Sequence, residues 1–240
     1  MKESTSGWIN GFLGVIIFAG SLPATRIAVA EFNPIFLTSA RAVIATLLGI
    51  ILILSFKQPY PKREDAASLM IIALGVVIGF PLLTAFALQY VTSAHSIVFV
   101  GLLPLCTAVF ASTRGAERPK PLFWLFSILG AASVVGYALK SYGYFSLKGD
   151  LLMLAAIIVC GLAYSEGGRL SRKIGGWQVI CWSLILSLPV MLPMALITLP
   201  ESFEHVTTRA VISLGYVSLC SMLLGFVFWY RGLAQGGVAA

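Results

Sequence analysis

The composition of this 240-residue chain excludes most soluble protein classes. Charged residues make up 10% of it and its mean hydropathy is +0.96, whereas a soluble domain carries about 25% charged residues. The net charge of +7 is divided among small groups of Lys and Arg between apolar stretches. Because no long basic patch with interleaved aromatic residues occurs, nucleic acid binding is not expected. The composition therefore predicts an integral membrane protein, with the lipid bilayer as its main partner.

Eight apolar stretches follow one another along the chain. Each is long enough to cross a bilayer as a helix, which takes about 20 mostly apolar residues. Lipid offers no hydrogen-bond partner to the backbone, so helices are expected in place of open sheets, and the stretches are too uniformly apolar for barrel strands. The predicted fold class is an all-α, multi-pass helical bundle. Its spans are predicted at about 8–30, 34–56, 66–88, 93–112, 121–139, 150–168, 176–199 and 209–231.

The basic residues between the spans predict an orientation. Cytoplasmic loops carry an excess of Lys and Arg, and this chain satisfies that rule if its N-terminus is cytoplasmic. The cytoplasmic segments then hold Lys2, Lys57, Lys62, Arg63, Arg114, Arg118, Lys120, Arg169, Arg172, Lys173 and Arg231, against Arg26, Lys140, Lys148 and Arg209 on the other side. We therefore expect a protein of the cell membrane with its N-terminus inside.

The order of the segments indicates two related halves. Residues 87–94 (ALQYVTSA) match residues 232–239 (GLAQGGVA) as a helix end, a short turn and small residues that open another helix. The predicted repeats are 1–140, with five helices, and 149–240, with three helices and the start of a fourth. An odd number of helices makes the second repeat inverted, as in many secondary transporters. About eight of ten helices are then present, and we expect a chain truncated at its C-terminus.

Several short motifs carry a family resemblance. They are GSLPATR at 20–26, Asn33-Pro34, TSAR at 38–41, the segment from Ala87 through Ser93-Ala94 to Leu103-Pro104, GDLL at 149–152, GLAY at 161–164 with Arg169, and FWYRGL at 228–233. In order and spacing they resemble the EamA-type proteins of the drug/metabolite transporter superfamily. The resemblance implies ten helices in two inverted five-helix repeats, and secondary transport of small metabolites or drugs, often efflux, by alternating access.

Arg41 is the first candidate substrate-binding residue. It lies seven residues beyond Pro34, about 10 Å into the second span. A cation at such depth is costly and usually faces the bundle interior or a wet cavity. Arg41 therefore predicts contact with an anion or substrate, or a charge that anchors the central cavity. The alternative is that the side chain extends to the outer headgroups.

Two further titratable residues are candidates. Glu166 precedes Arg169 by three residues on one helical face, which predicts an interfacial ion pair. Its alternative role is proton coupling, since carboxylates inside membranes often relay protons. His95 opens the fourth span, where it either titrates and binds substrate or serves as a capping or interfacial residue.

Pro104, Tyr90 and Tyr164 complete the candidate site. Pro104 lies within a span, where proline removes a backbone donor, bends the helix and exposes backbone groups that can line a cavity. The same bending is expected at Pro23, Pro81, Pro189 and Pro193. Tyr90 and Tyr164 either contact substrate or belong to the interfacial aromatic residues.

The remaining motifs predict packing. Gly75 and Gly79 form a GxxxG, and Gly130 and Gly136 flank small residues in the fifth span. Such residues allow close helix contact, within the bundle or in a homodimer. The four cysteines lie inside spans without metal-binding spacing. No phosphate loop, HExxH or GxSxG occurs. We predict no enzyme, cofactor or metal. A membrane enzyme acting on lipid or isoprenoid substrates and a non-transporting fragment are the alternatives.

Overall fold

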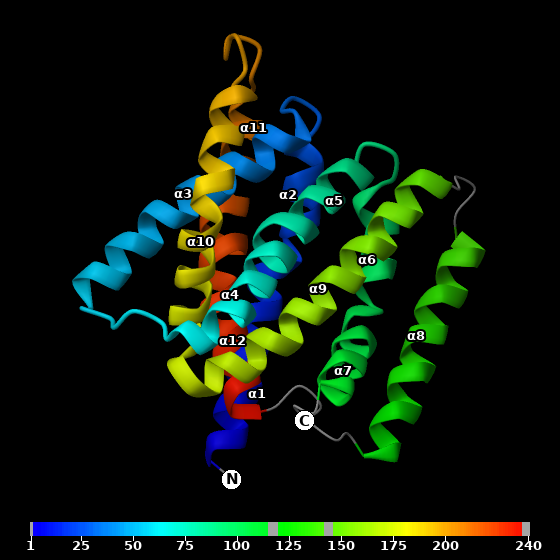
Figure 1. The fold of residues 1–240 in the computed structure, drawn as a ribbon. Helices are drawn as coiled ribbons and strands as arrows, with labels where there is room; N and C mark the ends of the chain where they lie inside the picture. Colours follow the sequence, from blue (N-terminus) through cyan, green and yellow to red (C-terminus); the bar gives the residue numbers. More distant parts are fainter. Residues whose placement is uncertain (1, 115–119, 142–145, 237–240) are drawn as a thin grey trace.

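The computed structural model describes residues 2–114, 120–141 and 146–236, without the side chains of 2–4, 134 and 137–141. Arg118 and residues 237–240, on which the orientation and repeat predictions partly rest, lie outside the described residues. The helices are α1 (Lys2–Ala19), α2 (Ser21–Ala28), α3 (Pro34–Ser55), η1 (Arg63–Asp65), α4 (Ala66–Ile72), η2 (Ala73–Gly79), α5 (Phe80–Ala87), α6 (Ser93–Val100), α7 (Leu103–Thr113), α8 (Pro121–Ser141), α9 (Leu147–Ile174), α10 (Gly176–Ile197), α11 (Thr208–Tyr216), η3 (Val217–Leu224) and α12 (Gly225–Gly236) (Figure 1).

The described residues are helical wherever they are regular, as predicted. Seven helical stretches are long and apolar enough to cross a membrane, and the apolar described part of α8, Pro121–Ser133, is shorter. Each stretch overlaps one predicted span. The seven are Thr5–Ala28, Pro34–Ser55, Arg63–Ala87, Ser93–Thr113, Leu147–Ile174, Gly176–Ile197 and Thr208–Gly236.

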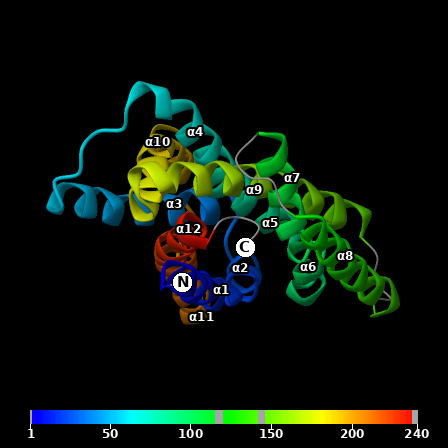
Figure 2. The same cartoon turned by 90° about the horizontal axis from the view of Figure 1, so that it is seen from below.

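The helix α8 connects the two ends of the bundle. The fourth span, α6 with α7, begins beside the start of α9, where His95 Nε2 lies 2.6 Å from Asp150 Oδ1. It ends near the last turns of α9, where Arg114 Nε lies 2.5 Å from Glu166 Oε1. The fourth span and α9 therefore run parallel. The helix α8, which lies between them in the sequence, runs in the opposite direction at the edge of the bundle (Figures 1 and 2). We name the two ends the Asp150 end and the Glu166 end.

Side chains at the loop–helix junctions define where several helices begin. Unpaired N–H groups at a helix start are satisfied by Asn, Ser or Thr oxygens. Four such bonds are present, from Ile35 N–H to Asn33, His95 N–H to Thr92, Gly149 N–H to Ser146 and Ala210 N–H to Thr207. Gly175, at a φ of 94°, ends α9 and turns the chain directly into α10, a conformation that favours glycine.

Four of the spans are not continuous α-helices. The first is interrupted at Gly20 and the fourth at residues 101–102, while the third and the last contain the π-helical segments η2 and η3. Of the five prolines that were predicted to bend a span, three lie where a helix begins or resumes: Pro23, Pro81 and Pro104. The other two, Pro189 and Pro193, lie inside α10 without ending it.

The two π-helices occupy matching positions. If residue 87 is paired with residue 232, as in the sequence repeat, then Ala73–Gly79 falls opposite 218–224, and η3 is Val217–Leu224. The α-helices that follow, α5 and α12, begin at the paired residues Phe80 and Gly225. The third span and the last therefore each contain a π-helix, an element that is rare and concentrates at functional sites.

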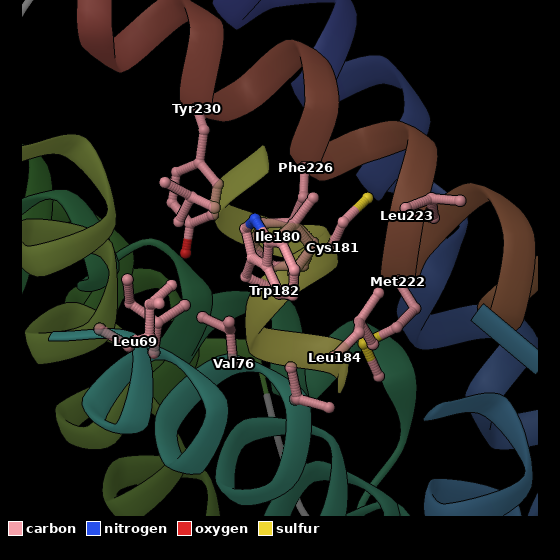
Figure 3. Close-up of a cluster of buried hydrophobic side chains, with 14 of the residues drawn as sticks. Leu69, Val76, Ile180, Cys181, Trp182, Leu184, Met222, Leu223, Phe226 and Tyr230 are labelled. Atoms are coloured by element: carbon pink, nitrogen blue, oxygen red, sulfur yellow. The ribbon is translucent and has the colours of Figure 1, made fainter. Parts of the chain in front are cut away.

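The core unites both halves of the chain. Figure 3 shows side chains from α4 and η2 (Leu69, Val76), from α10 (Ile180, Leu184) and from the last span packed together, and all of them are buried. Tyr230 is fully buried, and in Figure 3 its hydroxyl points toward Leu69. Outside the core, large apolar side chains such as Leu54 and Ile212 are exposed, as expected of a surface that faces lipid.

Glycines bring the first and last spans together. A Cβ added to Gly7 would lie 2.8 Å from the backbone nitrogen of Gly236. Likewise, a Cβ added to Gly232 would lie 2.7 Å from the backbone nitrogen of Gly11. The pairing runs antiparallel along α1 and α12, which lie side by side in Figures 1 and 2. Small residues therefore join helices inside this bundle.

The predicted GxxxG also packs within the bundle. A Cβ on Gly75 would lie 2.7 Å from the carbonyl oxygen of Val159 and closer still to the Cβ of Ala163, both on α9. A Cβ on Gly79 would lie 3.2 Å from Val159 Cγ2. The prediction of packing within the bundle is thus confirmed for this motif.

Gly75→Ala is expected to destabilise the fold by about 1–3 kcal/mol, because the added methyl forces η2 away from α9. The measurement is the unfolding free energy in mixed micelles with increasing denaturing detergent. Gly130→Ala is the matched control, since a Cβ there has nothing within 4 Å among the described residues. Equal stability of the two variants would contradict the close contact.

Candidate functional site

Arg41 lies in the bundle interior. Its side chain is 6% exposed, and Nη2 donates a hydrogen bond to Ser221 Oγ at 3.1 Å. The Nε group is buried and has no hydrogen-bond partner among the described residues. The guanidinium therefore faces the last span, near its middle, and does not extend toward the headgroups as the alternative interpretation required.

Two helix irregularities are connected to this arginine through hydrogen bonds. Ser221 belongs to the π-helix η3, and it also accepts a hydrogen bond from Ser21 Oγ at 2.8 Å. Ser21 begins α2 directly after the interruption at Gly20. We name Ser21, Arg41 and Ser221 the Arg41 cluster. Discontinuous helices at membrane depth are where secondary transporters form their substrate sites.

Arg41 has no charged partner within the described part of the chain. The carboxylates of Glu64, Asp65, Asp150 and Glu166 pair with other groups, and no ion pair joins any described carboxylate to Arg41. Placing an arginine at the centre of a membrane helix costs about 2.5–3.5 kcal/mol on insertion scales. Such a group is expected to meet an anion or water at some stage of function.

His95 and Tyr90 lie together at the Asp150 end. His95 is 8% exposed and bonds to Asp150, while Tyr90 is half exposed and its hydroxyl accepts a hydrogen bond from Lys148 Nζ at 2.7 Å. The Lys148 ammonium also lies 4.4 Å from the centre of the Tyr90 ring. Both predicted residues therefore bind the start of α9. The contacts of the described residues do not connect either of them to Arg41.

Glu166 lies in a cluster of charges at the opposite end. It is 1% exposed, and its carboxylate pairs with Arg114 at 2.5 Å and with Arg169 at 2.7 Å. Arg169 also donates to Ser68 Oγ at 2.8 Å. The predicted Glu166–Arg169 pair is present, and Arg114 extends it to the fourth span. We name these four residues the Glu166 cluster.

Tyr164 and Pro104 belong neither to the Arg41 cluster nor to the Glu166 cluster. Tyr164 is buried in an aromatic group with Phe226, Trp229 and Tyr230, with ring centroids 5.4–6.5 Å from its own. Pro104 is exposed at the start of α7. The six predicted residues thus do not form one site, and Arg41 is the one that bonds to a π-helix in the bundle interior.

The comparison with protein families decides the assignment. The model of the EamA-like transporter family matches residues 5–139 and 147–240. The chain belongs to this family. It is accordingly a multi-pass membrane transporter, as the motifs predicted.

Individual relatives agree with the family. The uncharacterized transporter YdeK of Bacillus subtilis (strain 168) is 60% identical over 240 residues, which cover 100% of this EamA-like chain and 84% of YdeK. An uncharacterized transporter of Archaeoglobus fulgidus is 24% identical over 93% of this chain and 78% of its own length. A solved crystal structure at 18% identity has a TM-score of 0.70 over 96% of this chain and 80% of the other, a likeness that shows the fold.

Sequence reasoning missed the partners of the candidate residues. Ser221 lies 180 residues from Arg41, and Asp150 lies 55 residues from His95. Arg114 was counted only as a loop charge, although it binds Glu166. A small polar residue inside an apolar span, as Ser221 is, was the one signal available. It does not identify which helix the hydroxyl faces.

Proposed function

We propose that this EamA-like protein is a secondary active transporter that exports small metabolites or drugs by alternating access, with Arg41 in contact with the substrate. The observation that carries the proposal is the buried Arg41 side chain, which lacks a charged partner among the described residues and donates to Ser221 of a π-helix, the serine that also bonds to Ser21 at the start of α2. Intramembrane ionisable residues mark substrate paths in transporters.

The proposal includes two inverted repeats of the five-helix type, residues 1–140 and 149–240, of which the second holds three helices and the start of a fourth. The matched π-helices η2 and η3 support this arrangement, as do the two separate family matches at 5–139 and 147–240. The parallel course of the fourth span and α9 also fits it, because the first element of an inverted repeat starts on the side opposite to that of α1. Relative rocking of the two repeats is then the expected transport motion.

The N-terminus is proposed to be cytoplasmic. The Glu166 end then faces the cytoplasm, and its basic residues Arg114, Arg169 and Lys173 follow the positive-inside rule. His95 and Asp150 face the outside. At each end of the bundle a contact between charged or polar side chains joins α9 to the fourth span. If α9 and the fourth span move apart at one end during transport, the contact at that end must break.

Proton coupling at Glu166 is a further part of the proposal. Its two arginines must move before the carboxylate can exchange a proton with solvent, which ties protonation to a conformational change. His95, Tyr90, Tyr164 and Pro104 are retained as secondary candidates for substrate contact. Membership of a transporter family argues against the membrane-enzyme alternative. A homodimer is also proposed, with α8 as the candidate surface at the edge of the bundle.

Proteoliposomes loaded with a defined mixture of labelled amino acids, nucleosides, sugars and organic acids test the transport proposal. At least one compound is expected to leave faster than from protein-free liposomes, at a rate that an imposed pH gradient changes. Mass spectrometry of the external medium measures the release. If Glu166 couples protons, Glu166→Gln removes the response to the gradient. Release that never exceeds the protein-free rate contradicts transport.

A further inference from the structure

The polar groups of the Arg41 cluster that lack partners are donors. Arg41 Nε carries a hydrogen and has no acceptor in the part of the chain that the structure describes. Ser221 Oγ accepts from Arg41 and shares one hydrogen bond with the Ser21 hydroxyl, so one of the two hydroxyl hydrogens is left over from that pair. A guanidinium has five N–H donors and no acceptor. The cluster therefore lacks an acceptor group, and its charge makes a negative acceptor the best match.

The residues that follow Arg41 and Ser221 in sequence are buried. Ala42 follows Arg41 and is fully buried, and Met222 and Leu223 follow Ser221 in the main core. Thr38, one turn before Arg41 on α3, is buried, and its hydroxyl has no hydrogen-bond partner within residues 2–114, 120–141 and 146–236. In such surroundings a cationic ligand is repelled, and a neutral ligand leaves the arginine uncompensated. An anion pairs with it.

We propose that Arg41 and Ser221 bind the anionic group of the substrate, so that the transported molecules are small organic anions with a carboxylate or phosphate group and an apolar remainder. The inference rests on the proposed transport function and names its substrate class. Planar donors on Arg41 match a carboxylate or phosphate in two-point contact, and the Ser221 hydroxyl supplies a further donor beside them.

Binding to purified protein in phosphatidylcholine nanodiscs tests the inference without transport. The probes are phenylacetate, indole-3-acetate and hexanoate, each paired with its neutral amide, together with benzylphosphonate. At least one acid is expected to bind tenfold or more tightly than its amide, because a hydrogen bond to a charged group contributes at least that factor. Tryptophan fluorescence titration gives the affinities, and benzylphosphonate tells a phosphate preference from a carboxylate preference.

The variants separate the site from general charge effects. Arg41→Gln is expected to bring the acid-to-amide ratio to about one, and Ser221→Ala to lower it while the charge remains. Arg41→Lys is expected to keep part of the preference. Arg209→Gln is the matched control, since this exposed arginine lies outside the cluster and its loss leaves the ratio unchanged.

Three results overturn the inference. The first is the absence of any acid preference in all pairs, and the second is an acid preference that survives Arg41→Gln. The third is loss of the preference in nanodiscs that contain phosphatidylglycerol, which assigns the site to a lipid phosphate. Failure of transport itself is distinguishable, because an Arg41-dependent acid preference without release from proteoliposomes refutes the transporter proposal and leaves the anion site standing.

Discussion

Arg41→Met is expected to lower gradient-sensitive release from proteoliposomes by ten- to a hundredfold without loss of folded protein. The loss of one charge-assisted contact accounts for that range. Because methionine keeps most of the volume and removes a buried charge that lacks a charged partner in the described chain, the unfolding free energy should remain equal or rise. Release rate and stability in mixed micelles are measured on the same preparation.

The comparison that decides this prediction is with Glu166→Gln. Without an imposed gradient, Arg41→Met should reduce the release rate more than Glu166→Gln does, because only Arg41 is placed against the substrate, whereas loss of Glu166 removes the response to the gradient. When a residue serves function at the expense of stability, its replacement lowers activity and raises stability. Unchanged release by a well-folded Arg41→Met variant would remove Arg41 from the substrate path.

Replacing both Arg114 and Arg169 by Gln is expected to destabilise the fold by about 3–5 kcal/mol. The double change leaves the Glu166 carboxylate, which is 1% exposed, buried without a counter-charge, and an uncompensated buried charge is strongly destabilising. Glu166→Gln alone should cost much less, since the Arg114 and Arg169 side chains are 44% and 50% exposed and can be hydrated. Denaturing-detergent titration measures all three.

A triple variant provides the control. Adding Glu166→Gln to Arg114→Gln and Arg169→Gln removes the buried charge together with its partners, so most of the lost stability should return. If the triple variant is as unstable as the double one, packing of the arginine side chains and not the carboxylate charge explains the loss.

The spans could be predicted because they follow from local rules. Asn33-Pro34 starts α3, as the sequence indicated, and Gly175, which separates α9 from α10, lies one residue before the predicted start of the seventh span at 176. The end of α9 was placed too early, at 168, while the helix continues to Ile174. Its last turns are polar, so hydropathy gave no signal. They remain helical where Arg169 and Lys173 contact Ser68, Glu64 and Asp65.

Helix irregularities were predicted only in part. Proline marked the restarts at Pro23, Pro81 and Pro104, but nothing local distinguishes these from Pro189 and Pro193, around which α10 continues. The π-helices η2 and η3 were not predicted. A π-turn alters the register by one residue without changing composition, so hydropathy does not detect it.

The sequence by itself determined that this protein is helical, crosses the membrane many times and belongs to the EamA-like transporters. Those properties depend on apolar length and on motif order, because a backbone in lipid must satisfy its own hydrogen bonds. Only the tertiary structure decided that Arg41 meets Ser221, that His95 meets Asp150 and that Glu166 meets Arg114. These partners lie on different spans, so their contact depends on how the helices pack and on the register that the π-helix gives Ser221.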